Sequence, residues 1–438
     1  MWEPEGYPDQ VESQITDAKP DTNQDVDLVG TTCDSRGQHV NNATGTIEYE
    51  CYFNPDGSLA WQVFLDARVD PRPMKLHWGD GICDEREANI QYALTPNLDD
   101  IALMLPLGIL SSKHVTPVSH SYIQFKKTSV AANDIIAQAD GYIVRIEGMP
   151  GDYGMVIQYS CDLYGQYGHL DELAGPVAEL NGQQIGYGKG TPEMRVPVKA
   201  GELVGRAGEI RTDWQMSDQG VTLPNLQPLN YVRQDFWKVH SVSALDYLPA
   251  DIKTALSTKL MRQSNPRVGK IDYDIAGTAS GAWFVEGTCY YIGRCEDYDM
   301  PYVDFSDQRG YWDTHMSIVP AALDPSVTLI GKGLVTSKGA AVLAFRDTLD
   351  PSTIKFGDAP RVFELVDYSY ESPDGKVWDP NDQSVPFFSS VKVVKGSSVT
   401  AVLVLQVTGD QTLKAELRVG PTASMKPEFT SAVQKFER

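Results

Sequence analysis

The sequence lacks several features that mark common classes of protein. Basic residues are few, with 37 Lys and Arg against 59 Asp and Glu, so the net charge is -22. Such a chain has no general attraction for phosphate backbones, and we expect no nucleic-acid partner. It also has no Gly-x-Ser-x-Gly elbow, no phosphate-binding glycine loop and no dinucleotide fingerprint. Serine hydrolases and nucleotide-dependent enzymes are therefore not indicated.

Long apolar runs are absent as well. The longest, residues 101–110 and 399–407, are interrupted by proline or by polar residues. Both are shorter than the roughly twenty apolar residues that a spanning helix needs, so we expect no transmembrane segment. Residues 1–10 are acidic and have no apolar stretch, so the given chain shows no recognisable signal peptide.

Cysteine is scarce and never occurs as Cys-x-x-Cys, which excludes the usual spacings of zinc and redox motifs. Cys289 and Cys295 bracket five residues that a disulfide could close, and Cys33 and Cys51 are further candidates. Buried free thiols in a reducing compartment are the alternative. The even number of six, with abundant Tyr, Thr, Gly and Pro, favours an exported protein that is extracellular, periplasmic or on the cell surface.

What is present is a succession of short alternating segments, which predicts a mainly β, antiparallel, multidomain fold. Residues 1–30 predict an acidic extended arm, and residues 31–97 a β-hairpin region in which Asn-Pro-Asp-Gly-Ser joins two alternating runs. Residues 98–264 combine short strands with one helix near residues 248–262. Residues 265–438 contain about eight strand-length runs, typical of an antiparallel β-barrel or β-sandwich.

Three motifs in residues 98–264 occur in the order seen in a known family. Ala137–Val144 is similar to an Ala-x-Ala-Asp-Gly-x-Val segment, Tyr167–Leu170 to a Tyr-x-His-Leu hairpin end, and Val198–Gly205 to a Val-x-x-Gly-x-x-Ile-Gly turn. Together they resemble the lysostaphin-type zinc metallopeptidases, the LytM-like or duplicated-hybrid-motif fold. The resemblance covers about a third of the chain. It implies a lysostaphin-like β domain with a cleft that, in the family, cuts peptide cross-links of peptidoglycan.

The resemblance also implies a zinc ion held by three side chains, with a fourth position for water. The family's His-x-x-x-Asp motif falls on residues 120–124, so His120 takes the first ligand position and Gln124 replaces the carboxylate. The family's His-x-His strand falls on residues 212–218, where Asp213 and Gln215 occupy the histidine positions. His169 keeps the place of the catalytic residue that stabilises the transition state.

Because two of the three ligands are missing, the leading hypothesis is a degenerate, catalytically inactive peptidase-fold protein. It would be an exported binding or structural protein whose cleft, with Gln124, Gln215 and Tyr167, holds a peptide, glycan or protein partner. The alternative is an active zinc metalloendopeptidase acting on peptidoglycan cross-links or glycine-rich peptides. It would need a new zinc site made by His114, His120 and Asp213. These histidines otherwise only hydrogen-bond to loop carbonyls.

Three further features suggest binding. Asp297 and Asp299 lie in an acidic stretch that could hold calcium, although a solvated acidic loop is the simpler interpretation. Gly281-Ala282-Trp283 resembles the opening of lipocalin-like barrels, which implies a small-molecule carrier as a second alternative function. Trp283 as a core aromatic is the competing interpretation. The acidic arm carries Trp2 and Tyr7 as anchors for self-association.

Overall fold

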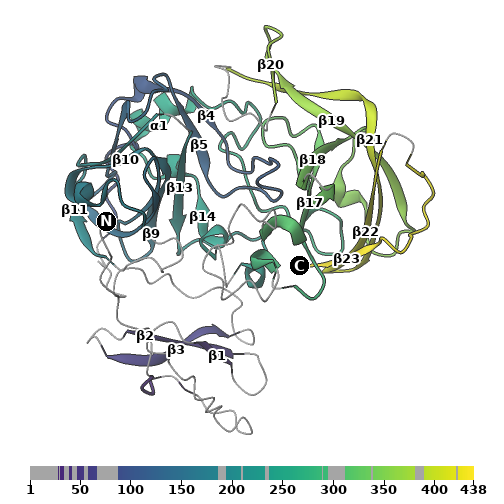
Figure 1. Ribbon diagram of the computed structural model, residues 1–438, viewed down its shortest axis with the longest axis horizontal. Coiled ribbons are helices and arrows are strands. Elements are labelled where there is room, and N and C mark those ends of the chain that lie inside the picture. The colour runs from purple at the N-terminus through teal and green to yellow at the C-terminus, as the bar shows by residue number, and fades with distance from the viewer. Residues whose placement is uncertain are drawn as a thin grey trace, which may run out of the picture. The chain divides into compact units, whose positions relative to one another are not determined.

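The computed structural model describes residues 28, 30–33, 39–41, 47–53, 58–66, 87–185, 194–208, 211–231, 236–288, 290–293, 311–336, 339–379, 389–420 and 423–438. The chain divides into two compact units, Met1–Pro71 and Arg72–Arg438. Its sheets are antiparallel and strands dominate the regular structure, which confirms the predicted fold class (Figure 1). The predicted domain limits at residues 30, 97 and 264 stay predictions. The arm anchors Trp2 and Tyr7 and the calcium candidates Asp297 and Asp299 lie outside the described residues.

The first unit contains one three-stranded sheet in the order β1-β2-β3. Its strands are β1 (His39–Asn41), β2 (Ile47–Phe53) and β3 (Leu59–Asp66). The register runs from Ile47 opposite Asp66 to Phe53 opposite Leu59, so the predicted hairpin is present. Its turn, residues 54–57, lies outside the described part. Tyr49 and Ala60 are buried.

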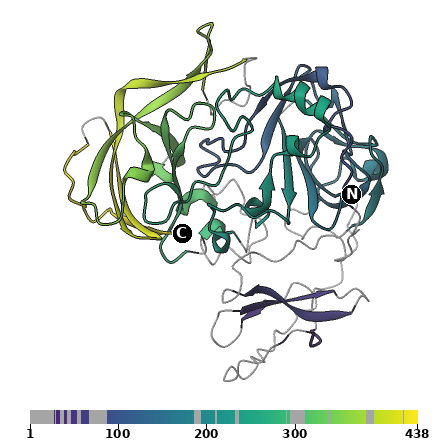
Figure 2. The same cartoon turned by 180° about the vertical axis from the view of Figure 1, so that it is seen from behind.

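The first lobe of the second unit is built on a twisted sheet in the order β11-β7-β8-β9-β13-β5-β4, with β14 beside β13 (Figures 1 and 2). Its strands are β4 (Ile101–Leu105), β5 (Ser121–Phe125), β7 (Gly141–Met149), β8 (Asp152–Gln158), β9 (Leu163–Leu170), β11 (Val196–Val198), β13 (Thr212–Asp218) and β14 (Ser241–Val242). A small sheet contains β6 (Asn133–Ile136), β10 (Glu172–Leu173) and β12 (Leu203–Ala207). Helix α1 (Ala250–Ser257) confirms the predicted helix, and Leu256 is its buried residue.

The second lobe is a closed barrel of eight antiparallel strands, because β18 pairs with β19 as well as with β17. Its strands are β15 (Gly281–Val285), β16 (His315–Pro320), β17 (Thr328–Thr336), β18 (Gly339–Phe345), β19 (Arg361–Glu371), β21 (Lys392–Gly409), β22 (Thr412–Val419) and β23 (Gln434–Glu437). Strand β20 (Val377–Trp378) pairs antiparallel with the end of β19. Of the two predicted alternatives, barrel and sandwich, the structure has the barrel.

The side chains of several barrel strands pack together into one apolar cluster. Trp283 is fully buried in this cluster, its Nε1 donates to the carbonyl of Ala279 at 3.0 Å, and the Arg438 guanidinium lies 4.0 Å from its ring centre. Trp283 is therefore a core aromatic residue. This packing does not favour the small-molecule carrier, which stays a prediction.

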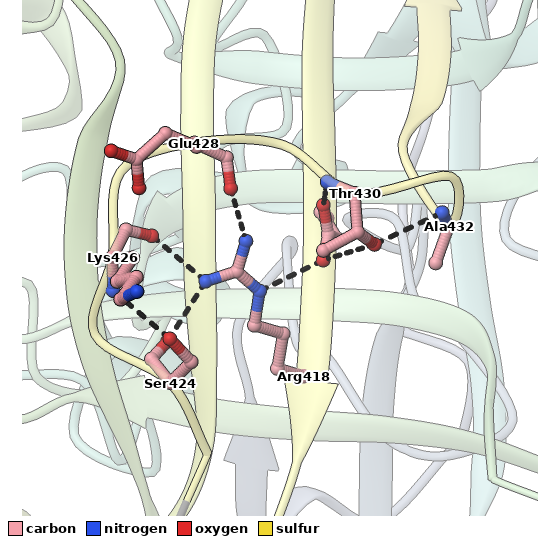
Figure 3. Close-up of polar contacts among 7 residues, drawn as sticks. Arg418, Ser424, Lys426, Glu428, Thr430 and Ala432 are labelled. Atoms are coloured by element: carbon pink, nitrogen blue, oxygen red, sulfur yellow. Dashed lines mark hydrogen bonds and ion pairs between the residues drawn. The ribbon is translucent and has the colours of Figure 1, made fainter.

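Arg418 on β22 ties a long connection to the outside of the barrel (Figure 3). Its guanidinium pairs with Glu416 at 2.8 Å and donates to the carbonyls of Ser424, Lys426 and Glu428. Glu416 in turn accepts from the amide of Thr430 at 2.6 Å and from its hydroxyl at 2.9 Å. Charge-assisted hydrogen bonds of this kind hold the segment that leads into β23.

The two lobes share apolar clusters within the second unit. One of them joins Leu103, Leu105 and Tyr122 of the first lobe to Tyr370 and Trp378 of the second. The backbones also meet closely, since a Cβ added at Gly331 of β17 would lie 2.2 Å from the carbonyl oxygen of residue 115. Only glycine allows this approach without displacement.

Two general expectations can be compared with the described residues. Within them, no helix has the length and apolar character that crossing a membrane requires. Cys33 and Cys161 each take part in a disulfide bond, and no described cysteine is free. Cys289 and Cys295 lie outside the described residues. A disulfide between these two cysteines stays a prediction, as does the participation of Cys51 in a disulfide.

Candidate functional site

A cavity of about 320 Å³ lies over the first-lobe sheet. Its floor comes from β7, β8, β9 and β13, and one wall is the loop that carries His114 and His120. The 3₁₀ helices η4 (Phe236–His240) and η6 (Tyr290–Ile292) provide Lys238 and Tyr291. Since η6 follows the first barrel strand, both lobes line this cavity.

The structure brings most of the predicted site residues to this cavity. The lining includes His114, His120, Tyr167, Asp213 and Gln215. Tyr167 turns its hydroxyl into the core, where it lies 2.6 Å from the hydroxyl of Tyr159 and donates to Gln138 at 3.0 Å. This hydroxyl is therefore engaged away from a ligand.

Two predicted site residues do not line the cavity. His169 is one of them, although it lies beside the lining residue Asp213, and Gln124 is the other. It is buried on β5, opposite Leu103 of β4, and its amide donates weakly to the carbonyl of Phe125 at 3.4 Å. The prediction that it binds a ligand in the cleft thus finds no support in its position.

Asp213 lies between two histidines. Its Oδ2 is 3.6 Å from Nε2 of His120 and 3.6 Å from Nε2 of His169. Strand register explains the placement, because Asp213 of β13 faces Gly168 of β9. A Cβ at Gly168 would lie 2.8 Å from the Asp213 carboxylate, so glycine there leaves room for this side chain. The three polar side chains form one interacting cluster at the edge of the cavity.

His169 is the cationic member of the cluster. Its backbone has a φ of 58°, in the left-handed region that few residues other than glycine adopt. Its Nδ1 lies 2.8 Å from Oδ1 of Asp152. The nearby Asp213 charge, together with the bond to Asp152, raises the pKa of His169 to about 9, against the opposing effect of desolvation. The same hydrogen bond lowers the pKa of Asp152.

His120 and His114 are instead held neutral. Desolvation is the main cause that lowers the pKa of His120, although Asp213 opposes it. Desolvation, followed by the charges of His120 and Lys238, lowers the pKa of His114 to about 3. Their rings meet edge to face, with centres 5.9 Å apart. At pH 7 His169 is therefore an imidazolium, whereas His120 and His114 are neutral imidazoles.

The sequence resemblance assigned Gln215 to a zinc-ligand histidine position, and in the structure both ends of its side-chain amide make hydrogen bonds. Its Oε1 accepts from Ser119 at 3.2 Å, and its Nε2 donates to Ser217 at 3.3 Å and to Ser241 at 3.1 Å. An amide so engaged is a poor substitute for an imidazole ligand.

The side chains around Asp213 include potential ligands for the zinc ion that the resemblance implies. In its favour, His120 Nε2 and Asp213 Oδ1 are buried and make no hydrogen bond within the described residues. Against it, no group of three or more His, Cys, Asp or Glu side chains in the described part is arranged to hold a metal ion. Catalytic zinc needs three such ligands that converge at about 2 Å. The residues present therefore do not fit the family's zinc site.

Several lining residues were missed in the sequence. Arg145 and Glu147 alternate along β7 and form an ion pair at 2.6 Å, a pattern that period-two spacing could have revealed. Trp237, Lys238 and Tyr291 come from the short 3₁₀ helices η4 and η6. Those segments carry no periodic signal that would place them at the cavity.

Comparisons with known proteins give only distant likenesses. No protein-family model matches the chain, and no curated protein matches it. Two crystal structures of Helicobacter pylori Csd3 match at 15% and 12% identity, over 43% and 49% of this chain and 49% and 54% of theirs, with TM-scores of 0.19 and 0.20. A zinc containing peptidase from Vibrio cholerae matches at 11% identity, over 39% of this chain and 44% of that one, with a TM-score of 0.17. The chain spans about half the length of these proteins, and at such TM-scores no property of theirs is assigned to it.

Proposed function

We propose that this chain is a peptide-binding protein on a lysostaphin-like scaffold, and that its cavity holds a ligand without zinc-dependent cleavage. The proposal depends on the hydrogen bonds of the Gln215 side chain. It stands at a family ligand position, yet three serine hydroxyls take up its amide while the cavity beside it stays open. The scaffold is kept and the metal-binding chemistry is not.

The lining of the cavity suits an extended peptide. Gln166 and Ser119 offer amide and hydroxyl groups, and Trp237 and Tyr291 offer apolar rings. Peptides need both kinds of partner, because their backbone groups must stay hydrogen-bonded when they leave water. At Gly154 of the floor no side chain projects, which lets a ligand approach the sheet backbone.

The test combines binding, metal content and cleavage on the purified full chain. N-acetyl-triglycine amide serves as the peptide probe, chitotetraose as the glycan probe and pentaglycine as the cleavage substrate. We expect calorimetry to show binding of the peptide probe, elemental analysis to show no stoichiometric zinc, and mass spectrometry to show intact pentaglycine. Stoichiometric zinc with cleavage, both lost in His120→Ala, would overturn the proposal in favour of an active endopeptidase. Binding of the glycan alone would overturn the choice of a peptide.

We also propose that the protein is exported. The disulfide-bonded state of Cys33 and Cys161 supports this, because such bonds persist in oxidising compartments. Thiol alkylation of the protein taken directly from its native cells would show both cysteines protected. Rapid alkylation of both would contradict export.

A further inference from the structure

Gln166 of β9 lies on the floor of the cavity, next to a second glutamine. It is opposite Val156 of β8 on one side and opposite Gln215 of β13 on the other, and all three residues line the cavity. Directly opposite residues on neighbouring strands project their side chains from the same face of a sheet. The two side-chain amides are therefore neighbours on the cavity floor.

The two amides differ in how far their hydrogen-bonding groups are used. Serine hydroxyls engage both ends of the Gln215 amide. Gln166 is half-buried and makes one long hydrogen bond, from its Nε2 to the hydroxyl of Ser217 at 3.4 Å. Within the described residues its Oε1 accepts no hydrogen bond, although an amide oxygen has two lone pairs. Gln166 thus has an acceptor left over in the cavity.

Ser217 determines which end of the Gln166 amide is left over. Its hydroxyl donates its one proton to the carbonyl of Trp237 at 3.5 Å. The lone pairs that remain on the hydroxyl oxygen accept N–H groups, one from each of the two glutamines. Nε2 of Gln166 therefore faces Ser217, and Oε1 is the end that a ligand can reach.

The floor beside Gln166 leaves room for a peptide backbone. Gly154 lines the cavity two residues before Val156 on β8, so it adjoins the row that contains Gln166. It projects no side chain, and a Cβ added there would have its nearest neighbour at 3.5 Å. An extended peptide over Gly154 brings its backbone N–H groups close to the side chain of Gln166.

We propose that Oε1 of Gln166 accepts one backbone N–H of the bound peptide, and that this contact selects residues with an unsubstituted amide nitrogen. The inference rests on the proposed peptide-binding function and specifies what the ligand must offer. A proline or an N-methylated residue at this position has no N–H. It leaves Oε1 without a partner in a place that the ligand has closed to water, and such an unsatisfied acceptor weakens binding.

The experiment titrates four peptides into the purified full chain by calorimetry. They are N-acetyl-triglycine amide and three variants of it, in each of which one glycine is replaced by N-methylglycine. We expect at least one variant, the sensitive peptide, to bind the wild type roughly fivefold to a hundredfold more weakly than the parent, as the loss of one hydrogen bond to a buried acceptor predicts.

Gln166→Met separates this contact from a steric effect of the methyl group, because it keeps the length of the side chain and removes the acceptor. In Gln166→Met the parent and the sensitive peptide should bind alike, with the affinity that the wild type has for the sensitive peptide. Gln166→Leu also lacks the acceptor and should behave in the same way. Gln183→Met is the matched control, because Gln183 has an exposed amide outside the cavity, and it should keep the full difference.

The outcomes distinguish this inference from the proposed function. Equal affinities of the wild type for all four peptides, or an unchanged difference in Gln166→Met, would overturn the inference and leave peptide binding in place. Thermal unfolding shows whether each variant is folded. Folded Gln166 variants that bind no peptide would also contradict the inference, because Gln166 would then be needed for the cavity as a whole. Failure of the wild type to bind any of the peptides would overturn the peptide-binding function itself.

Discussion

The unusual charge state of His169 can be tested by replacing Asp213 with asparagine, which keeps the shape of the side chain and removes its charge. The carboxylate lies 3.6 Å from Nε2 of His169 and is the largest cause of the raised pKa. Two unit charges about 4 Å apart attract by ~1 kcal/mol in water and by ~4 kcal/mol at an effective dielectric constant of about 20. Because the side chain of His169 is 37% exposed, the effective energy lies toward the lower figure.

Each 1.36 kcal/mol corresponds to one pH unit in a titration midpoint, so a loss of about 1–3 kcal/mol should bring the pKa of His169 from about 9 into the range of ~7–8. Asp152 keeps it above the ordinary value of 6.5. The measurement is a histidine-detected NMR titration, with the signal assigned through His169→Gln. Asp162→Asn, a carboxylate on another loop, is the control. A wild-type midpoint at or below 6.5, or an unchanged midpoint in Asp213→Asn, would refute this account of the cluster.

Three other predictions concern stability and metal binding. Because the folded pKa of His169 lies above 6.5, its contribution to stability is complete below pH 6.5 and is lost as pH rises through about 9. After allowance for its exposure, we expect the free energy of unfolding to fall by about 1 kcal/mol over this range. Urea unfolding should show this decrease in the wild type and not in His169→Gln. Gln215→His adds a third imidazole or carboxylate donor near His120 and Asp213, and should raise zinc content well above that of an exposed control, Gln183→His. Gly331→Ala forces a Cβ against a carbonyl of the other lobe and should cost about 1–3 kcal/mol in thermal unfolding, whereas Ala at Gly154, with its nearest neighbour 3.5 Å away, should change little.

The β elements could be predicted because their signal is local. Alternation on both sides of the sequence Asn-Pro-Asp-Gly predicts the hairpin whose strands pair between residues 47 and 66. Closure of the barrel depends instead on the pairing of β18 with β19. The spacing of strand-length segments in the sequence does not show whether this pair forms, so it could not distinguish a barrel from a sandwich.

The chemistry of the site was harder to predict, because it depends on tertiary contacts. The assignment of Gln124 to the cleft followed the family pattern, whereas the structure buries this side chain beside the neighbouring strand. Lys238 and Tyr291 lie 53 positions apart and meet only when the lobes pack. Desolvation, the main cause of the low pKa of His114, likewise exists only in the folded state.

Because both lobes line the cavity, a truncated protein that contains only the first lobe would have an incomplete cavity. A fragment that stops at residue 264 lacks Tyr291, which lines the cavity and whose ring contacts the Lys238 side chain. It also loses residues that pack in one cluster with Leu226, Tyr231 and Val239, namely Ile271, Ala282, Phe284 and Tyr291. Shortening the second unit at residue 264 would therefore remove part of the cavity lining and expose apolar side chains that the intact unit buries.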